Sequence, residues 1–150
     1  MVRILMSLQN ILEYEAELAI ALKAPVVGTV RAKKLLARMG QGYVSFKSKC
    51  DWLLKQSLIS EQGWTIIEEV RRLRNALVHV RPSPARRKHT YRRRPLLTRN
   101  TLRMLLVDTE HVLRALRAIS GNKCDWATVP PGYASEMGWP DSDITFLQRR

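Results

Sequence analysis

Helical periodicity is the feature that most constrains how this chain can fold. Apolar residues recur every three or four positions through most of residues 1–121, and no segment alternates apolar and polar residues over several turns as a half-buried strand would. Glycine and proline separate the periodic segments. The pattern predicts an all-α fold: a single-domain, up-and-down bundle of four to five helices over residues 1–121, followed by an irregular C-terminal tail over residues 122–150.

The ends of the predicted helices are marked by capping and breaking residues. The first helix should cover about residues 2–23 and end before Pro25, which lacks a backbone donor. A third helix should start near Tyr43 and point Tyr43, Phe46, Cys50, Leu53 and Leu54 inward. Candidate N-caps are Thr29, Ser60 and Thr98, and candidate stops are Gly40 and Gly121.

The charge of the chain indicates a polyanionic partner. The chain has 150 residues, with 26 Lys and Arg against 13 Asp and Glu, which gives a formal net charge of +13. Such an excess favours nucleic acid first and an acidic membrane second. A basic protein without such a partner is the alternative, because net charge describes partners and not the fold.

Cysteine usage and hydropathy predict the compartment. Cys50 and Cys124 have no CxxC spacing and give no disulfide framework, which favours a reducing cytoplasm. The apolar N-terminal segment is broken by Glu13, Glu15 and Glu17, so it does not approach the roughly 20 apolar residues that span a membrane. We therefore expect a soluble, cytoplasmic protein that does not enter a membrane.

An arginine interrupts the apolar stripe of the helix that ends near His79. At about 100° per residue, Ile66, Val70, Leu73 and Leu77 lie on one face, and Arg74 falls inside that face. An unpaired buried guanidinium would cost several kcal/mol. Arg74 can extend its charged end to water, line a cleft and meet an anion there, or pair with a carboxylate. The candidate carboxylates are Glu13, Glu15, Glu17 and Asp51.

Asn75 and His79 share a neighbouring face of the same helix, because they are four residues apart. Arg74 and His79 diverge by about 140° on a straight helix, so they can converge only at the helix end. Pro82 and Pro84 predict a turn just past His79. A lone histidine at this position is more often a partner of the helix dipole than a catalyst.

The stretch "RRLRNALVH", residues 71–79, resembles the Arg–polar–x–x–x–His motif of HEPN domains, which are all-α bundles. The preceding stretch "SFKSKCDWLLKQSLISEQGW" and the following "RPLLTRNTLRMLLVDTEHVLRAL" are similar to the helices that flank this motif. The resemblance covers roughly residues 40–118 and has its most specific part in Arg74 through His79.

The resemblance implies a metal-independent endoribonuclease of the toxin or phage-defence type, acting on RNA as a homodimer without a cofactor. A cognate antitoxin or nucleotidyltransferase is a further implied partner. Carried over by position, Arg74 would stabilise charge on the phosphate, Asn75 would orient the phosphate or His79, and His79 would act as general acid or base in attack by the ribose 2′-OH. Imidazole and guanidinium suit these roles chemically. The three histidines, His79, His89 and His111, show no spacing of metal ligands.

A basic loop over residues 80–97 follows the motif and predicts contact with RNA. Basic side chains bind phosphates, and an aromatic ring can stack on an unpaired base. A solvated loop without a partner is the alternative. The predicted RNA-binding residues are Arg71, Arg81, Arg86, Arg87, Lys88, Tyr91, Arg92, Arg93 and Arg94.

Two features leave the branch of the family open. Some HEPN toxins carry a modifiable tyrosine two residues after the motif histidine, whereas this chain has Arg81 there. A mannitol-operon-repressor-like group also carries an "RN…H" motif. The alternative function is therefore a non-catalytic regulatory or interaction module, in which Arg74, Asn75 and His79 support the dimer structure.

Overall fold

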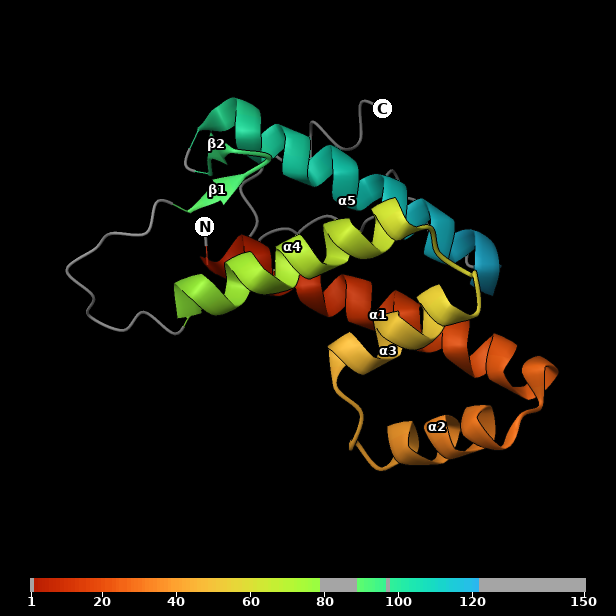
Figure 1. The fold of residues 1–150 in the computed structure, drawn as a ribbon. Coiled ribbons are helices and arrows are strands. Elements are labelled where there is room, and N and C mark those ends of the chain that lie inside the picture. The colour runs from red at the N-terminus through yellow and green to blue at the C-terminus, as the bar shows by residue number, and fades with distance from the viewer. Residues whose placement is uncertain (1, 79–88, 97, 122–150) are drawn as a thin grey trace, which may run out of the picture.

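The computed structural model describes residues 2–78, 89–96 and 98–121. Within these ranges the predicted all-α fold is confirmed. The predicted tail over residues 122–150 lies outside the described part of the chain. The elements are α1 (Val2–Val27), α2 (Val30–Gly40), α3 (Phe46–Lys55), α4 (Glu61–Val78), β1 (Thr90–Tyr91), β2 (Arg94–Pro95) and α5 (Arg99–Ser120) (Figure 1).

Helix α1 is the centre of the bundle, because it packs against each of the other four helices. Helices α4 and α5 also pack against each other, whereas α2 packs mainly on α1. The N-terminal end of α1 and the C-terminal end of α4 lie at the same end of the bundle (Figure 1). The core is apolar and includes Leu5, Leu8, Leu12, Leu53, Ile67, Leu73, Leu105, Leu113 and Leu116.

Helix caps lie where the sequence predicts them. Thr29, Ser60 and Thr98 each accept a hydrogen bond from the backbone amide three residues later, at 3.1, 3.0 and 3.3 Å. Gly121 ends α5 with φ +68°, a left-handed conformation that glycine adopts without a steric penalty. These caps satisfy amides that the first helical turn leaves without an internal partner.

One predicted boundary, the end of the first helix, is wrong by a few residues. Helix α1 continues through Pro25 to Val27, because a proline this close to the helix end costs only one backbone bond. The backbone amide of Gly28 still donates to the carbonyl of Ala24 at 3.0 Å, and φ +66° at Gly28 then ends the helix. Helix α2 ends at Gly40, as predicted, and the chain then turns at Gly42, which has φ +76°.

The predicted inner face of the third helix is confirmed in α3 except at its start. Phe46, Cys50 and Leu53 are buried, and burial raises the pKa of the Cys50 thiol to about 12. Tyr43 lies before α3 and is 72% exposed, so its predicted inward position is wrong. The reason is that the capping residue Ser45 starts the helix after Tyr43.

A short antiparallel hairpin occupies the end of the predicted basic loop. Thr90 pairs with Pro95, and Tyr91 pairs with Arg94. The two residues between the strands, Arg92 and Arg93, have φ of +48° and +62°. Such two-residue turns need positive φ at both positions and usually carry glycine or asparagine. Strands of two residues are too short to give the alternation by which a strand is predicted.

Ion pairs connect α1 to α3 and α5. The ammonium of Lys49 on α3 lies 2.7 Å from Glu13 and 2.5 Å from Glu17, although Lys49 is only 5% exposed. Arg117 on α5 donates from Nε to Glu15 at 3.1 Å. Burial alone would lower the pKa of Lys49, but the hydrogen bonds and charges of Glu13 and Glu17 outweigh it, so the pKa is raised and Lys49 is charged at neutral pH.

We predict that Lys49→Ala destabilises the fold by about 2 kcal/mol, because two carboxylates lose their buried partner. The loss of stability should be smaller than for a fully buried ion pair, since Glu17 is partly exposed and its carboxylate can be solvated by water. Urea unfolding monitored by circular dichroism measures the change. The matched control is Lys47→Ala, which removes an exposed pair with Asp51 and should not change the unfolding midpoint. Equal unfolding midpoints for both variants would contradict the assigned role of Lys49.

Candidate nucleic-acid interface

Arg74 and Asn75 are brought together on the last turns of α4. Ile67, Val70 and Leu73 are buried by the core, whereas Arg74 and Asn75 are only partly buried. Arg74 donates from Nη1 to Oδ1 of Asn75 at 3.0 Å. The amide therefore holds the guanidinium at the edge of the apolar stripe, and the remaining N–H donors of Arg74 are available to another acceptor.

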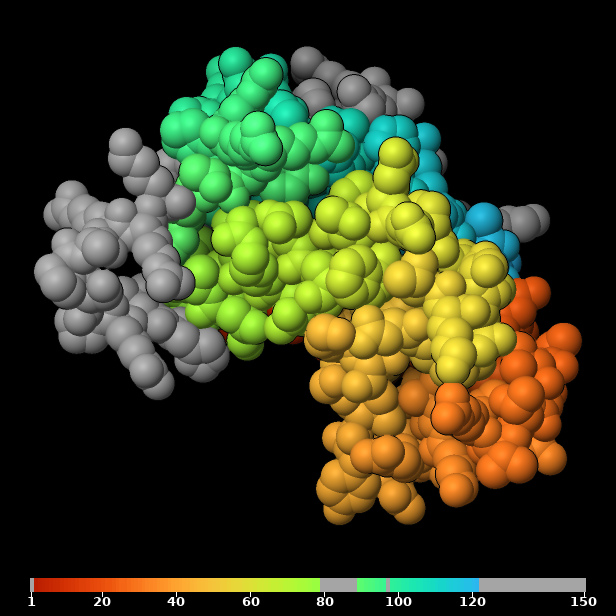
Figure 2. Space-filling view, viewed as in Figure 1, coloured from red at the N-terminus to blue at the C-terminus, as the bar shows by residue number. Residues whose placement is uncertain are grey.

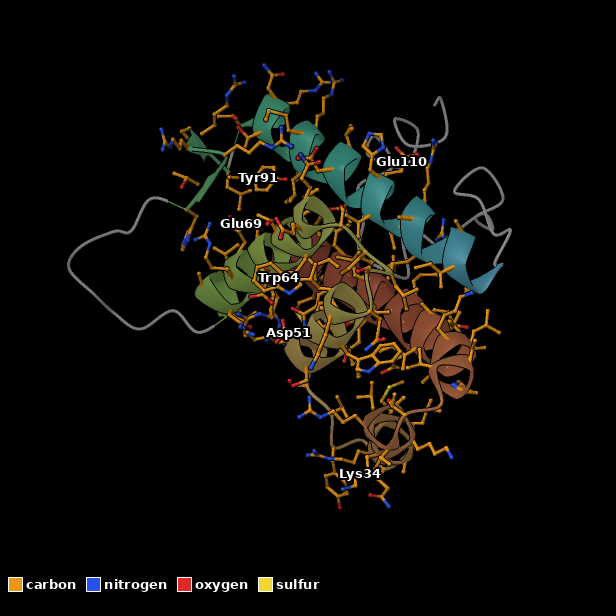
Figure 3. The ribbon with its side chains drawn as sticks, turned by 45° about the vertical axis from the view of Figure 1, so that its right-hand side comes forward. Lys34, Asp51, Trp64, Glu69, Tyr91 and Glu110 are labelled. Atoms are coloured by element: carbon orange, nitrogen blue, oxygen red, sulfur yellow. The ribbon has the colours of Figure 1, made fainter. Side chains whose placement is uncertain are left out.

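None of the four carboxylates predicted as partners of Arg74 binds it. Glu13 and Glu17 bind Lys49, and Glu15 accepts from Arg117. Asp51 accepts from Lys47 at 2.7 Å and from the indole of Trp64 at 2.8 Å (Figure 3 labels Asp51 and Trp64). Within the described residues, Arg74 therefore has no carboxylate partner.

The other two arginines of α4 are neutralised by ion pairs within the helix. Arg71 donates to Glu68 at 2.8 Å, and Arg72 donates to Glu69 at 2.7 Å. With Glu61, α4 carries three acidic and three basic residues and has no net charge. Contact between Arg71 and RNA stays a prediction, but its charge is already compensated in this structure.

The hairpin is fixed to α4 on one side and to α5 on the other. Arg72 donates from Nη2 to the backbone carbonyl of Thr90 at 2.9 Å. Asp108 on α5 accepts from the Tyr91 hydroxyl at 2.5 Å and pairs with Arg92 at 2.8 Å. The carboxylate of Asp108 thus holds Tyr91 at the end of β1 and Arg92 in the turn, and offsets part of the strain of a turn without glycine.

Tyr91 does not have the exposure that our prediction of base stacking requires. Its side chain is 1% exposed, and it lies between the hairpin and α5 (Figure 3). Burial and the hydrogen bond to Asp108 raise the pKa of the Tyr91 hydroxyl, so Tyr91 is a neutral donor. Tyr91 is therefore a core residue, and the prediction that its ring stacks on an RNA base is wrong for this structure.

The tip of the hairpin presents arginines to solvent. Arg92, Arg93 and Arg94 are all exposed. Arg92 is paired with Asp108, and Arg94 approaches the sulfur of Met104 at 3.8 Å. Arg93 forms no ion pair with any residue of the described ranges. The tip therefore carries positive charge that Asp108 compensates only in part.

Several predicted site residues lie outside the described part of the chain. Of the other two histidines, His111 is exposed and His89 is partly buried. The described residues contain no group of three or more His, Cys, Asp or Glu side chains that could hold a metal ion. The predicted residues outside the description are His79, Arg81, Arg86, Arg87 and Lys88.

Asp108 is the site residue that sequence reasoning missed. It lies on α5, far along the chain from the motif helix, and its role depends on the position of the hairpin. Its carboxylate is largely buried, with a side-chain exposure of 14%. The sequence gives one signal, an acidic residue among apolar ones in a predicted helix. This signal does not indicate which residue the carboxylate contacts.

No protein-family model, curated protein or solved structure matches this chain. Among the helices of the described ranges, none has the length and apolar character that crossing a membrane requires.

Proposed function

We propose that this protein binds RNA and cleaves it as a metal-independent endoribonuclease of the HEPN type, in a toxin or phage-defence role. The observation that carries the proposal is the state of Arg74. It is the arginine of α4 without a carboxylate partner among the described residues, and Asn75 holds it near the end of the helix. A partly buried guanidinium in this state favours an anion as its ligand, and phosphate matches its fixed donors.

The proposed reaction is transesterification within the RNA strand. His79 removes the proton of a ribose 2′-OH, and the 2′ oxygen attacks the adjacent phosphorus. The bond from phosphorus to the 5′ oxygen breaks, and a proton from a second acid reaches the leaving oxygen. Arg74 stabilises the charge on the pentacoordinate phosphorus, while Asn75 orients Arg74. The products are a 2′,3′-cyclic phosphate and a 5′-OH.

A two-fold dimer would supply the second acid as the partner subunit's His79. Exposed apolar side chains support a dimer interface at the end of the bundle where α1 begins and α4 ends. Val2 and Met6 lie near the start of α1, and Val78 ends α4. Both helix ends lie at the same end of the bundle (Figure 1). Closed two-fold symmetry is also the commonest form of homo-oligomer.

We predict that His79→Ala lowers RNA cleavage by about 10²–10⁴ in rate, as expected for loss of a general acid or base, while RNA affinity stays nearly constant. Arg74→Ala should lose cleavage and part of the affinity, since it faces the anion throughout the reaction. Cleavage should persist in EDTA and leave 2′,3′-cyclic phosphate ends. The assay incubates mixed single-stranded RNA with EDTA and compares wild type with both variants.

The control for this assay is the unfolding free energy of Arg74→Ala. Because Arg74 has no carboxylate partner in the described structure, its removal should leave stability unchanged within about 0.5 kcal/mol. A strong loss of stability without any effect on RNA would favour the non-catalytic interaction module. Equal cleavage by wild type and His79→Ala would remove His79 from its assigned role.

We also predict that the protein is a dimer at roughly tens of micromolar, a concentration that must be stated because association follows mass action. Multi-angle light scattering measures the mass directly. Met6→Glu should yield a monomer, because a charge at an apolar interface disfavours association. Tyr14→Glu, which changes an exposed residue further along α1, is the matched control and should remain dimeric. A monomeric wild type would contradict the two-fold arrangement.

A further inference from the structure

Helix α2 carries the largest uncompensated positive charge of the described helices. Residues 18–50 contain seven basic residues and no acidic one. Four of the seven are on α2, and none of these four forms an ion pair with a residue of the described ranges. All four are exposed: Arg31, Lys33, Lys34 and Arg38. Their charge is therefore open to an anion from outside, unlike that of the paired arginines on α4.

The basic residues of α2 are directed away from the bundle by its amphipathic pattern. Ala32 is buried against the core, and Leu35, Leu36 and Met39 pack partly against it. Arg31, Lys34 and Arg38 are spaced three and four residues apart, which places them on one face of a helix. At 1.5 Å per residue, this face extends over roughly 10 Å from Arg31 to Arg38.

An exposed aromatic ring follows this basic face. Tyr43 is 72% exposed, in contrast to the buried Tyr91. Its backbone amide donates to the carbonyl of Arg38 at 3.1 Å, after a turn at Gly42 with φ +76°. The backbone of Tyr43 is therefore fixed to the end of α2. A cationic helix face that ends in an accessible ring combines the two features by which proteins hold single-stranded nucleic acid.

We infer that α2 and Tyr43 form a second binding face for single-stranded RNA. Arg31, Lys34 and Arg38 bind successive phosphates, and an unpaired base stacks on the Tyr43 ring. The inference rests on the proposed function and deepens it, because α4 has no net charge and gives RNA little electrostatic affinity of its own. Figure 2 shows the outline of the molecule indented between α4 and the column of α3 and α2.

A membrane surface is the competing ligand for a basic helix, and the structure favours RNA over it. An interfacial helix inserts its apolar face among lipid chains. The apolar face of α2 instead packs against the core, and the face that it exposes is charged. The exposed large apolar side chains near α2 are Leu22, Val26 and Val30, around the turn from α1 into α2, and Tyr43 after α2.

The test measures how labelled single-stranded RNA, with 2′-O-methyl groups to prevent cleavage, binds at several salt concentrations. Arg31→Gln/Lys34→Gln/Arg38→Gln should bind about tenfold more weakly and lower the slope of log K against log salt by about 2, since each phosphate contact in a single strand contributes about 0.7. The matched control, Arg31→Lys/Lys34→Arg/Arg38→Lys, keeps the charge and should keep affinity within about twofold.

The ring is tested separately. Tyr43→Leu should weaken binding about 5- to 150-fold, because one stacked base is lost. Tyr43→Phe keeps the ring and should bind like wild type. Circular dichroism confirms that every variant keeps its helical content, which is expected because all the changed side chains are exposed.

The outcomes separate this inference from the proposed function. If wild type binds RNA and the triple Gln variant binds with the same affinity and salt slope, the α2 face is overturned while RNA binding stands. If wild type binds no RNA, the proposed function and the inference fall together. Wild-type binding to phosphatidylserine vesicles without binding to RNA, lost in the triple Gln variant, would assign the face to a membrane and overturn the inference as well.

Discussion

The pairing of Lys49 with Glu13 and Glu17 is the constraint on which the rest of the structure depends. Glu13 and Glu17 are four residues apart and share one face of α1, whereas Glu15 is turned by about 160° from each. Helix geometry therefore sends two carboxylates toward α3 and one toward Arg117 on α5. A charged lysine with so little exposure is stable only with such partners, so α3 is held in one position along α1.

This division of carboxylates leaves Arg74 without a partner from α1. The local sequence supplies none either, because the residues three and four positions before Arg74 are Arg71 and Val70, and those after it are Leu77 and Val78. Arg71 and Arg72 each have a glutamate three residues before them and form ion pairs with it. The difference among the three arginines of one helix is therefore set by spacing, and it leaves Arg74 as the arginine of α4 without a carboxylate partner among the described residues.

Much of the fold could be predicted from local patterns. Thr29, Ser60 and Thr98 act as caps through contacts three residues away, and the pairs on α4 use the same spacing, so the sequence alone specifies them. The burial of Tyr91 could not be predicted in this way. The burial depends on a hydrogen bond to Asp108, which lies on α5. The basic residues around Tyr91 in the sequence instead predicted a side chain exposed to solvent.

The candidate site was predicted only in part for the same reason. Arg74 and Asn75 are adjacent in one helix, so their contact could be predicted. The absence of a carboxylate at Arg74 could not, because it depends on tertiary contacts. Lys49 and Arg117 bind the glutamates of α1, and Asp51 accepts from Trp64. The basic face of α2 was not predicted, because the net charge of the chain does not show which helix keeps an uncompensated positive charge. That depends on which basic residues form ion pairs in the tertiary structure.

Arginine side-chain NMR tests the central claim that Arg74, which has no carboxylate partner among the described residues, is the guanidinium of α4 that binds RNA. The Nε–Hε signals of Arg74 and Arg72 are followed while 2′-O-methyl RNA is added, with assignments from Arg74→Lys and Arg72→Lys. The Arg74 signal should shift in proportion to bound RNA, whereas the Arg72 signal should stay, because Glu69 and the carbonyl of Thr90 already accept from its donors. An Arg74 signal that does not move while RNA binds would contradict the account.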